Sequence, residues 1–551
     1  MRTHLIRFPM TRAVSAVVVS LLALALTACG SGGGGGGAPP LGPGDKVGTC
    51  ASAGGPPVTI QGRITYERLR LSLLGLGPAT EIRAARHIDV ELRSATSGAC
   101  YGRTSTDANG DYQLIVLPAA GESVELAVFS RTLEAADHDI LVHNALPPFA
   151  PPHSETNVFS HVSSAFAAAS TTVDLLVPYR ISQTDRPGAG FGLLDTLVTC
   201  SDRLAATGVS PNETVHAYTR VGNNGLLGTS YYSHTSRSLA ILGGASGLED
   251  DSDTDYFDDA VVAHEFMHFV DKHISHNMSR GGAHSGELLE PGFAWSEGMA
   301  TGFGCLLMRS PHYMDSSKTD ATEPNSIRFY TNAENATAYD PPGIGGEFTV
   351  AEVVWDCADT DVGLDTDGDG VDTAFGDLVR AIDSFDPATD GPYIGLFLTR
   401  LVALSATIST PALSAMLASG PEDQEISFPP TGDDVWPKPI TVGGPVANGT
   451  VSSLVPNPCR GLEASHWYQF TLISPAVVRI DLRITGIGGS GDNLDLYLFT
   501  NNEVNFAIAG SNSFGNSDES ITASLTAGTY IVRVEASCLS SHNAAYELEI
   551  Q

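Results

Sequence analysis

Basic residues are scarce in this chain. Its 551 residues include 29 lysines and arginines against 63 aspartates and glutamates, which gives a formal net charge of −34. Because phosphate backbones are bound by clustered basic side chains, this balance excludes nucleic acid as an expected partner. The 58 glycines follow no fixed period, which excludes a fibrous chain. The length exceeds what one hydrophobic core supports, so we expect two to four domains.

The sequence also lacks an apolar run of comfortable transmembrane length. Arg2, Arg7 and Arg12 form a basic leader before an apolar stretch at 13–26, which has the length of a signal-peptide core. This stretch ends in Leu-Thr-Ala-Cys29, which resembles the lipobox of bacterial lipoproteins. The resemblance implies a lipoprotein signal peptide at 1–28 and lipidation of Cys29. An ordinary signal peptide, with Cys29 incidental, is the alternative.

Glycine, serine and proline dominate the residues after Cys29, so 29–56 is predicted to be a flexible tether. A tether after a lipid anchor suits an exported protein of the bacterial cell envelope that has the membrane as a partner. Gly30 stands where inner-membrane retention in enteric bacteria is associated with aspartate, which favours the outer membrane.

No Cys-x-x-Cys spacing occurs among the seven remaining cysteines, which disfavours a zinc–thiolate site. In an oxidising exported setting, scattered cysteines are better interpreted as disulfide partners, although an odd number leaves at least one over. The expected pairs are Cys459–Cys538, from their shared C-terminal module, and Cys50–Cys100 and Cys305–Cys357, from proximity in sequence.

Alternating polar and apolar runs separated by turns predict strands from 57 to about 132. The order Gly-Arg-Ile-Thr-Tyr66, Val-Glu-Leu92 and Asp-Ala-Asn-Gly-Asp-Tyr-Gln-Leu114 resembles the carboxypeptidase-regulatory type of β-sandwich. That resemblance implies a sandwich at 57–150 that acts as a spacer or adhesion module, without chemistry of its own.

The C-terminal part, 440–551, returns to alternating strands after a Pro-rich, acidic linker at 421–439. Trp-Tyr-Gln-Phe470, Asp-Asn-Leu-Asp-Leu-Tyr-Leu498, Gly-Thr-Tyr-Ile-Val-Arg-Val534 and Tyr-Glu-Leu548 follow one another in this part. Their order resembles the bacterial pre-peptidase C-terminal domain. That module commonly accompanies secreted peptidases, so the resemblance favours proteolysis as the function.

The motif that carries chemistry is His264-Glu265-Phe-Met-His268, inside a predicted helix at 256–273. Residues four apart share a helix face, so both imidazoles can point at one ion, and Zn²⁺ accepts such ligands. Glu265 lies one step round the helix, where it can act as general base on a zinc-bound water. The alternative is a chance match on an ordinary amphipathic helix with exposed histidines.

A catalytic zinc site usually has three protein ligands. The metzincin pattern fails, because Ile274 stands where it needs its third histidine. Trp-Ser-Glu297-Gly-Met-Ala resembles the glutamate-bearing ligand helix of gluzincin aminopeptidases and of the thermolysin family, which implies Glu297 as third ligand. Thr301 replaces the aspartate of the thermolysin family, which puts the support of His264 in doubt. The competing ligands, nearer in sequence, are Glu287 and Glu290.

Other roles stay open in the sequence. An oxyanion-stabilising donor is needed, and the candidates are Tyr330, Tyr339 and His312. His276 and His284 are expected to be solvated loop histidines, with substrate contact as the alternative. A helix at 347–357 resembles the closing helix of several gluzincins and is expected to pack in the core.

Asp365, Asp367 and Asp369 alternate around a glycine, like the first half of a calcium loop. Gly376 stands where an EF-hand needs its bidentate acid, so a different type of calcium loop or a solvated acidic turn is expected.

The sequence thus predicts a multidomain protein: an N-terminal β-sandwich, a central α+β zincin-like catalytic domain at 151–430 and a C-terminal β-sandwich. The expected function is that of an exported zinc metallopeptidase, acting on protein or peptide substrates with Zn²⁺ and with Ca²⁺ as a further candidate cofactor. Endopeptidase action is favoured because no Gly-x-Met-x-Asn motif is present. The alternative is a surface adhesion lipoprotein whose central domain is an inactive scaffold.

Overall fold

Several sequence predictions fall outside the part of the chain that the structure describes. They are the signal peptide 1–28, the lipidation site Cys29, nearly all of the tether 29–56, the pair Cys459–Cys538, Glu287, Tyr339, and the calcium loop with Asp365, Asp367 and Asp369. The computed structural model describes residues 50, 54–133, 139–154, 157–182, 184–224, 228–244, 253–282, 284, 288–316, 327–335, 342–359, 371, 373–419, 425–453, 465–487, 493–513, 517–536 and 542–551.

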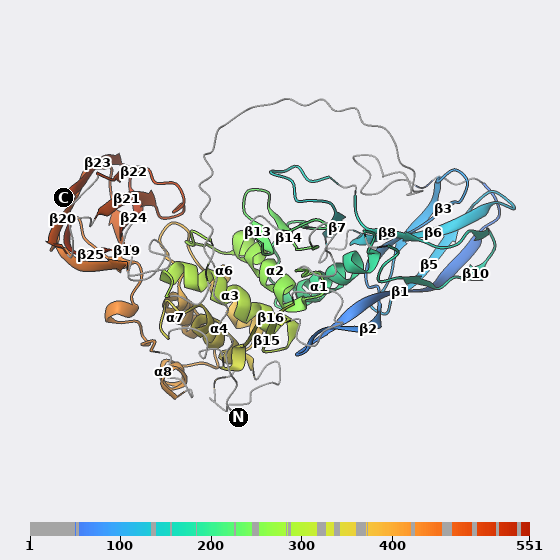
Figure 1. Cartoon of the computed structure of the whole chain (residues 1–551), viewed down its shortest axis with the longest axis horizontal. Helices are drawn as coiled ribbons and strands as arrows, with labels where there is room; N and C mark the ends of the chain where they lie inside the picture. Colours follow the sequence, from blue (N-terminus) through green and yellow to red (C-terminus); the bar gives the residue numbers. More distant parts are fainter. Residues whose placement is uncertain are drawn as a thin grey trace, which may run out of the picture. The chain divides into compact units, whose positions relative to one another are not determined.

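The strands expected at 57–132 form two sheets around a shared apolar core (Figure 1). Ile60, Ile64 and Tyr66 of the first strand are fully buried, as alternation in a strand predicts. One sheet contains β1 (Val58–Ser72), β2 (Gly75–Ala84), β5 (Asp111–Val116), β10 (Thr171–Thr172) and β11 (Leu175–Val177). The other contains β3 (Ile88–Ser94), β4 (Cys100–Ser105), β6 (Ser123–Thr132), β8 (Ser160–Val162) and β9 (Phe166–Ala167).

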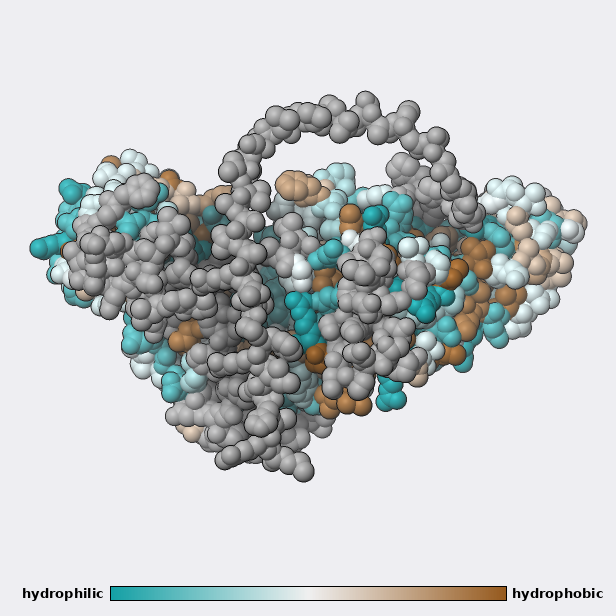
Figure 2. All heavy atoms as spheres, viewed as in Figure 1, coloured by the Kyte–Doolittle hydropathy of each residue, from teal (hydrophilic) through white to brown (hydrophobic). Residues whose placement is uncertain are grey.

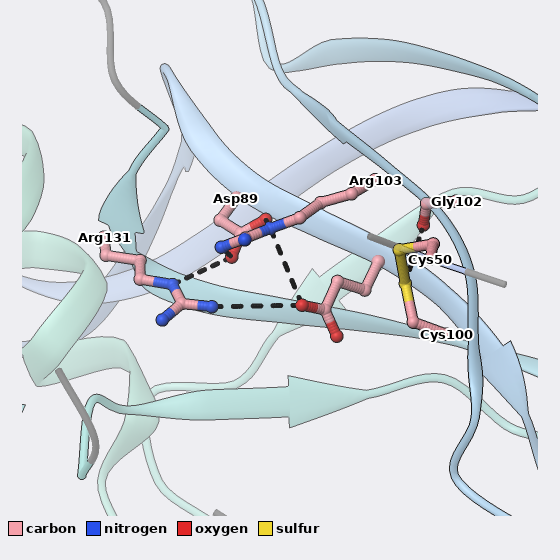
Figure 3. Close-up of a disulfide and its surroundings, with 7 residues drawn as sticks. Cys50, Asp89, Cys100, Gly102, Arg103 and Arg131 are labelled. Atoms are coloured by element: carbon pink, nitrogen blue, oxygen red, sulfur yellow. Dashed lines mark hydrogen bonds and ion pairs between the residues drawn. A yellow bond between two sulfur atoms is a disulfide. The ribbon is translucent and has the colours of Figure 1, made fainter. Parts of the chain in front are cut away.

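Cys50 and Cys100 form a disulfide that ties the segment before β1 to β4 (Figure 3), which confirms this predicted pair. Close to it in Figure 3, the fully buried Asp89 accepts hydrogen bonds from Arg103 and Arg131, at 2.6 and 2.8 Å. The predicted pair Cys305–Cys357 is wrong, because both residues are buried as thiols in the described structure. Proximity in sequence did not bring their sulfur atoms together.

The second sheet does not end at residue 150. It continues from β6 through β7 (Ile140–Asn144) and β12 (Val215–Thr219) to β14 (Ser238–Ala240) and β13 (Tyr231–Ser233). β7 and β12 pair in parallel, and β13 pairs antiparallel with β14 at the end of the sheet. The domain boundary at 150 remains a sequence prediction, and one sheet with one core extends across it.

Helices pack around this extended sheet and share its core. The helix expected at 256–273 is present as α2 (Asp259–Ile274), which packs against α1 (Pro187–Ala205) and α3 (Pro291–Met308) (Figure 1). The closing helix is α4 (Glu347–Asp356); it is buried along its length, as expected. The other helices among the described residues are α6 (Phe375–Asp383), α7 (Ile394–Leu404) and α8 (Thr410–Ser419), with 3-10 turns at Ala333–Asn335 and Gly432–Asp434. β15 (His312–Ser316) and β16 (Ile327–Asn332) form a hairpin.

In the part of the chain described, no helix combines the length and apolarity needed to cross a membrane.

The C-terminal sandwich has its own hydrophobic core, so the protein is multidomain, as predicted. One sheet has the order β17 (Lys438–Pro439), β19 (Ser465–Leu472), β24 (Gly528–Ala536), β21 (Leu494–Thr500), β22 (Ala509–Ser511). The other has the order β18 (Ala447–Ser453), β25 (His542–Ile550), β20 (Ala476–Ile487), β23 (Glu519–Leu525). Trp436, in the predicted linker, is buried and its ring lies 5.5 Å from that of Trp467.

Apolar side chains also reach the surface singly. On the face shown in Figure 2, hydrophobic and hydrophilic residues are interspersed over the N-terminal strands. Ile82 and Ile115, for example, are 60% and 72% exposed. Scattered apolar residues of this kind are normal on a protein surface and indicate no binding site by themselves.

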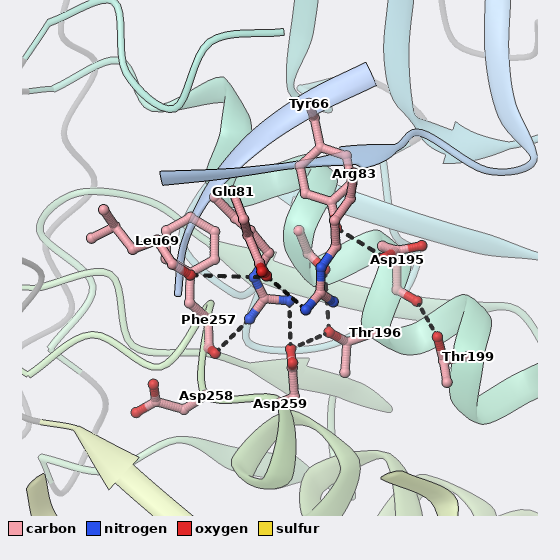
Figure 4. A network of polar contacts seen from close by, with 12 residues as sticks. Tyr66, Leu69, Glu81, Arg83, Asp195, Thr196, Thr199, Phe257, Asp258 and Asp259 are labelled. Carbon is pink, nitrogen blue, oxygen red and sulfur yellow. Dashed lines mark hydrogen bonds and ion pairs between the residues drawn. The ribbon is translucent and has the colours of Figure 1, made fainter. Parts of the chain in front are cut away.

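Polar contacts from β1 and α1 support the beginning of α2, and Figure 4 labels Phe257, Asp259 and Thr196 among the residues that take part. Arg68 is 1% exposed; its Nη1 donates to Asp259 Oδ1 at 2.9 Å and its Nη2 donates to the Phe257 carbonyl at 2.8 Å. The Thr196 hydroxyl of α1 donates to the same Asp259 oxygen at 2.6 Å. The N-terminal strands therefore hold the start of the helix that carries the His-Glu-x-x-His motif.

We predict that Arg68→Met lowers the free energy of unfolding by about 3 kcal/mol, because it leaves a largely buried carboxylate and a buried carbonyl without their donor. Chemical denaturation of the purified protein measures this change. Arg63→Met is the matched control on the same strand, since Arg63 and Asp111 form an exposed ion pair whose loss should change stability little. Equal effects of the two substitutions would contradict the role given to Arg68.

Candidate metal centre

The two motif histidines lie on one face of α2 and point at the same place. Their Nε2 atoms are 3.0 Å apart, and the two rings are nearly perpendicular. Val262, Phe266 and Phe269 are buried on the same helix, so its apolar residues anchor it in the core. Both side chains are largely buried, with 9% of His264 and 12% of His268 exposed.

Glu297 of α3 completes this group. Its Oε2 lies 3.2 Å from His268 Nε2 and 3.4 Å from His264 Nε2, and the three donor atoms are within 4.8 Å of one another. The competing candidate Glu290 is instead 2% exposed and forms an ion pair with Arg280, so it is not available as a ligand. Two imidazole nitrogens and a carboxylate oxygen are the donor set that zinc accepts.

The charges at this group favour a cation. Burial lowers the pKa of His268, but the charge and hydrogen bond of Glu297 outweigh it and raise the pKa to about 9. Burial raises the pKa of Glu297, but the charges and hydrogen bonds of the two histidines outweigh burial and hold this pKa well below the ordinary value. Without a metal ion, a proton supplies the positive charge that these residues require. The residues present therefore fit a divalent cation.

Glu265 follows His264 on α2, and part of its carboxylate has no partner among the described residues. Its side chain is buried, and burial raises its pKa even though the two histidines act in the opposite direction. The backbone N–H of Tyr232, in β13, donates to the carboxylate. Its Oε2 has no hydrogen-bond partner among the described residues. A buried carboxylate oxygen without a donor is costly unless a ligand or water uses it.

Thr301 stands where the thermolysin family has an aspartate, and its side chain contacts His264. Its Oγ1 lies 3.0 Å from His264 Nδ1, and the residue is 2% exposed. Nδ1–H can donate to this hydroxyl, which leaves the lone pair on Nε2 for a metal ion. The sequence put the support of His264 in doubt, and a neutral hydroxyl group supplies it.

Glycines let α3 approach its neighbours closely enough for Glu297 to reach the histidines. A Cβ at Gly304 would lie 3.2 Å from the His264 backbone nitrogen in α2. A Cβ at Gly298 would lie 2.3 Å from the Glu347 carbonyl oxygen in α4, a separation that real atoms do not tolerate. The glycine after Glu297 is therefore a packing requirement of the α3–α4 contact.

A tyrosine that the sequence did not single out lies beside the histidines. The Tyr313 ring centroid is 5.9 Å from that of His264, and burial with the charges of Asp315 and Glu265 raises its pKa well above the ordinary value. The predicted candidates His312 and Tyr330 bond to each other instead, Nδ1 to Oη at 3.0 Å. Tyr313 was missed because it lies on a strand outside any motif, and only the fold brings it here.

Of the two loop histidines expected to be solvated, His276 is buried and His284 is 27% exposed. His276 is 6% exposed, and burial lowers its pKa. The His284 Nε2 lies 3.3 Å from a carboxylate oxygen of Glu347, and its ring packs edge-on against Phe293. That ion pair ties the loop after α2 to the start of α4.

Known proteins resemble one part of this chain. The profile of the bacterial pre-peptidase C-terminal domain family matches residues 464–536. A comparison with curated proteins finds no match.

Among solved structures, the pre-peptidase C-terminal domain of a collagenase from Bacillus anthracis is 17% identical over 21% of this chain and 93% of that chain, with a TM-score of 0.16. A periplasmic inhibitor of g-type lysozyme from Aeromonas hydrophila is 15% identical over 21% of this chain and 98% of that chain, with a TM-score of 0.14. The family match carries the assignment, and these scores add nothing to it. Residues 464–536 are a bacterial pre-peptidase C-terminal domain, inside the β-sandwich that the sequence predicts at 440–551.

Proposed function

We propose that this protein is a zinc-dependent peptidase with His264, His268 and Glu297 as metal ligands and Glu265 as general base. The observation that carries the proposal is the convergence of three donor atoms within 4.8 Å, next to a buried carboxylate oxygen that has no described partner. An inactive scaffold has no need to keep such a carboxylate beside two imidazoles. The pre-peptidase C-terminal domain adds support, because this module is typical of secreted bacterial peptidases.

Each residue of the candidate site would have its own role in peptide-bond cleavage. A zinc ion held there would supply Lewis-acid activation of water and polarisation of the scissile carbonyl. Glu265 would accept the proton of the attacking water at its free oxygen and return it to the leaving amine. Thr301 holds His264 in the tautomer that keeps Nε2 free. Tyr313 is our candidate donor to the oxyanion, in place of the three residues suggested by sequence.

The edge of the sheet supports cleavage within an extended peptide. β13 is the last described strand on its side of the sheet, and its pairing partner is β14. The Tyr232 N–H points at Glu265 and thus away from β14. A peptide that added as a further strand along this edge would pass the candidate metal centre, and both of its ends could extend beyond it. This geometry favours an endopeptidase over an exopeptidase.

The site of action follows from the sequence. We propose an exported protein, lipid-anchored through Cys29 in the cell envelope with the outer membrane favoured, that cleaves proteins or peptides there. An adhesion lipoprotein with an inactive central domain would keep the fold without metal or cleavage.

Glu265→Gln should abolish most peptide-bond cleavage while leaving zinc content unchanged, because it removes the base without removing a ligand. We expect a rate loss of at least about 100-fold in chelator-sensitive casein cleavage. A peptide-library digest of the unaltered protein then gives the cleavage preference. Undiminished cleavage by the Glu265→Gln variant would contradict the mechanism, and a chain without cleavage or zinc would favour the adhesion alternative.

Glu297→Gln should reduce bound zinc to well below one ion per chain, as measured by metal analysis after dialysis. Glu287→Gln is the matched control, since Glu287 is the competing acid nearer in sequence. It should retain zinc. The reverse result, loss with Glu287→Gln and retention with Glu297→Gln, would show that the third ligand is assigned wrongly.

Thr301→Val should weaken zinc binding by about 10- to 100-fold, because nothing would then orient the His264 ring. Thr301→Ser keeps the hydroxyl and should bind zinc like the unaltered protein. Competition against a zinc indicator measures both affinities. If valine and serine bind equally well, the hydrogen bond to His264 Nδ1 has no part in holding the metal.

A further inference from the structure

A second group of acidic side chains lies at the end of β15, outside the sequence motifs described above. Asp253 and Asp255 come from the segment before α2, and Asp315 comes from β15. One carboxylate oxygen of each lies within 4.8 Å of the other two. Asp258, nearby, is not available for a ligand role, because its oxygens accept from the Ser316 N–H at 2.5 Å and from the Ser316 hydroxyl at 2.9 Å.

The central member of this group is buried with a free oxygen. Asp255 is 3% exposed; the Ser230 hydroxyl donates to its Oδ2, and within the described structure no donor reaches its Oδ1. Buried oxygens of Asp253 and Asp315 likewise have no hydrogen-bond partner there. Three carboxylates from two chain segments thus lie close together, and each has a buried oxygen without a donor in the described structure.

The charge in this volume is not balanced by the described side chains. Arg328 forms an ion pair with Asp253, and we find no further Lys or Arg paired with Asp255 or Asp315 among the described residues. Several like charges at close range with little solvent are strongly unfavourable, so such carboxylates either take up protons or share a cation. A cation between the three carboxylates would offset their negative charges and contact one oxygen of each.

The donor set selects the class of cation. All three ligands are carboxylate oxygens, which hard cations prefer, and neither imidazole nor thiolate is present to favour zinc. Calcium–oxygen distances of about 2.3–2.6 Å allow two ligands on opposite sides to be almost 5 Å apart. Oxygens that all lie within 4.8 Å of one another are compatible with such an ion, and carbonyl groups or waters can complete its coordination.

We propose that Asp253, Asp255 and Asp315 bind a structural calcium ion that joins the segment before α2 to β15. This site is distinct from the loop at 365–369 and does not depend on the zinc proposal. Its consequence for the candidate metal centre follows from the strand: Tyr313 is two residues before Asp315, so both side chains are on the same side of β15. The ion would fix β15, and with it Tyr313, relative to the helix that carries His264.

Calcium alone, added to the metal-free full chain, tests this site through thermal unfolding. At about 5 mM calcium, we expect the midpoint to rise by on the order of 5 °C. Asp255→Asn should abolish the rise. This variant should also be at least as stable as the unaltered protein without calcium, because it removes a buried charge, and so misfolding does not explain its result.

Two control variants separate this site from the others. Asp367→Asn alters the predicted loop and Glu297→Gln alters the candidate zinc site, and both should keep the calcium-dependent rise. The proposal is overturned if calcium does not stabilise the unaltered protein, or if Asp255→Asn responds to calcium as the unaltered protein does. A response lost in Asp367→Asn and kept in Asp255→Asn would place the calcium at the loop instead.

Discussion

The close approach of α2 and α3 is the constraint on which the rest of the structure depends. The two histidines come from one helix and Glu297 from the other, so their donor atoms converge only if the helix backbones nearly touch. Gly304 permits that contact with the backbone at His264, and Gly298 permits the matching contact of α3 with α4. The same packing places Thr301 against His264 Nδ1. One helix interface thus brings together the three candidate ligands and the hydroxyl group that contacts one of them.

The N-terminal strands are part of the structure that supports the site. Their resemblance to a spacer domain suggested no such role. In the structure, Arg68 of β1 bonds to the first turn of α2, and the sheet continues from β6 to β13, beside Glu265. The C-terminal sandwich has a second core of its own, and its Trp467, Phe499, Val504 and Ile531 pack into the first core. The core that surrounds the candidate metal centre therefore includes the N-terminal strands from Val58 onward.

The features predicted from the sequence are those that depend on the local spacing of residues. The spacing of His264 and His268 is enough to put both on one helix face, and the strands and the C-terminal module follow from alternation and order. Glu297 was identified only through a family resemblance, because the sequence of a helix does not tell how close a second helix packs against it. Tyr313, Asp315 and the hydroxyl support from Thr301 could not be predicted, since each depends on contacts between segments far apart in the chain. For the same reason Cys305 and Cys357 were paired wrongly.

The central claim is that two imidazoles and one carboxylate of this chain hold a zinc ion. X-ray absorption at the zinc edge, on the purified protein loaded with one equivalent of zinc, tests it most directly. The account predicts a first shell of nitrogen and oxygen atoms at about 2.0–2.1 Å with the outer-shell pattern of two imidazoles, which becomes altered in Glu297→Gln. A sulfur shell near 2.3 Å, or a shell with no imidazole, would contradict it.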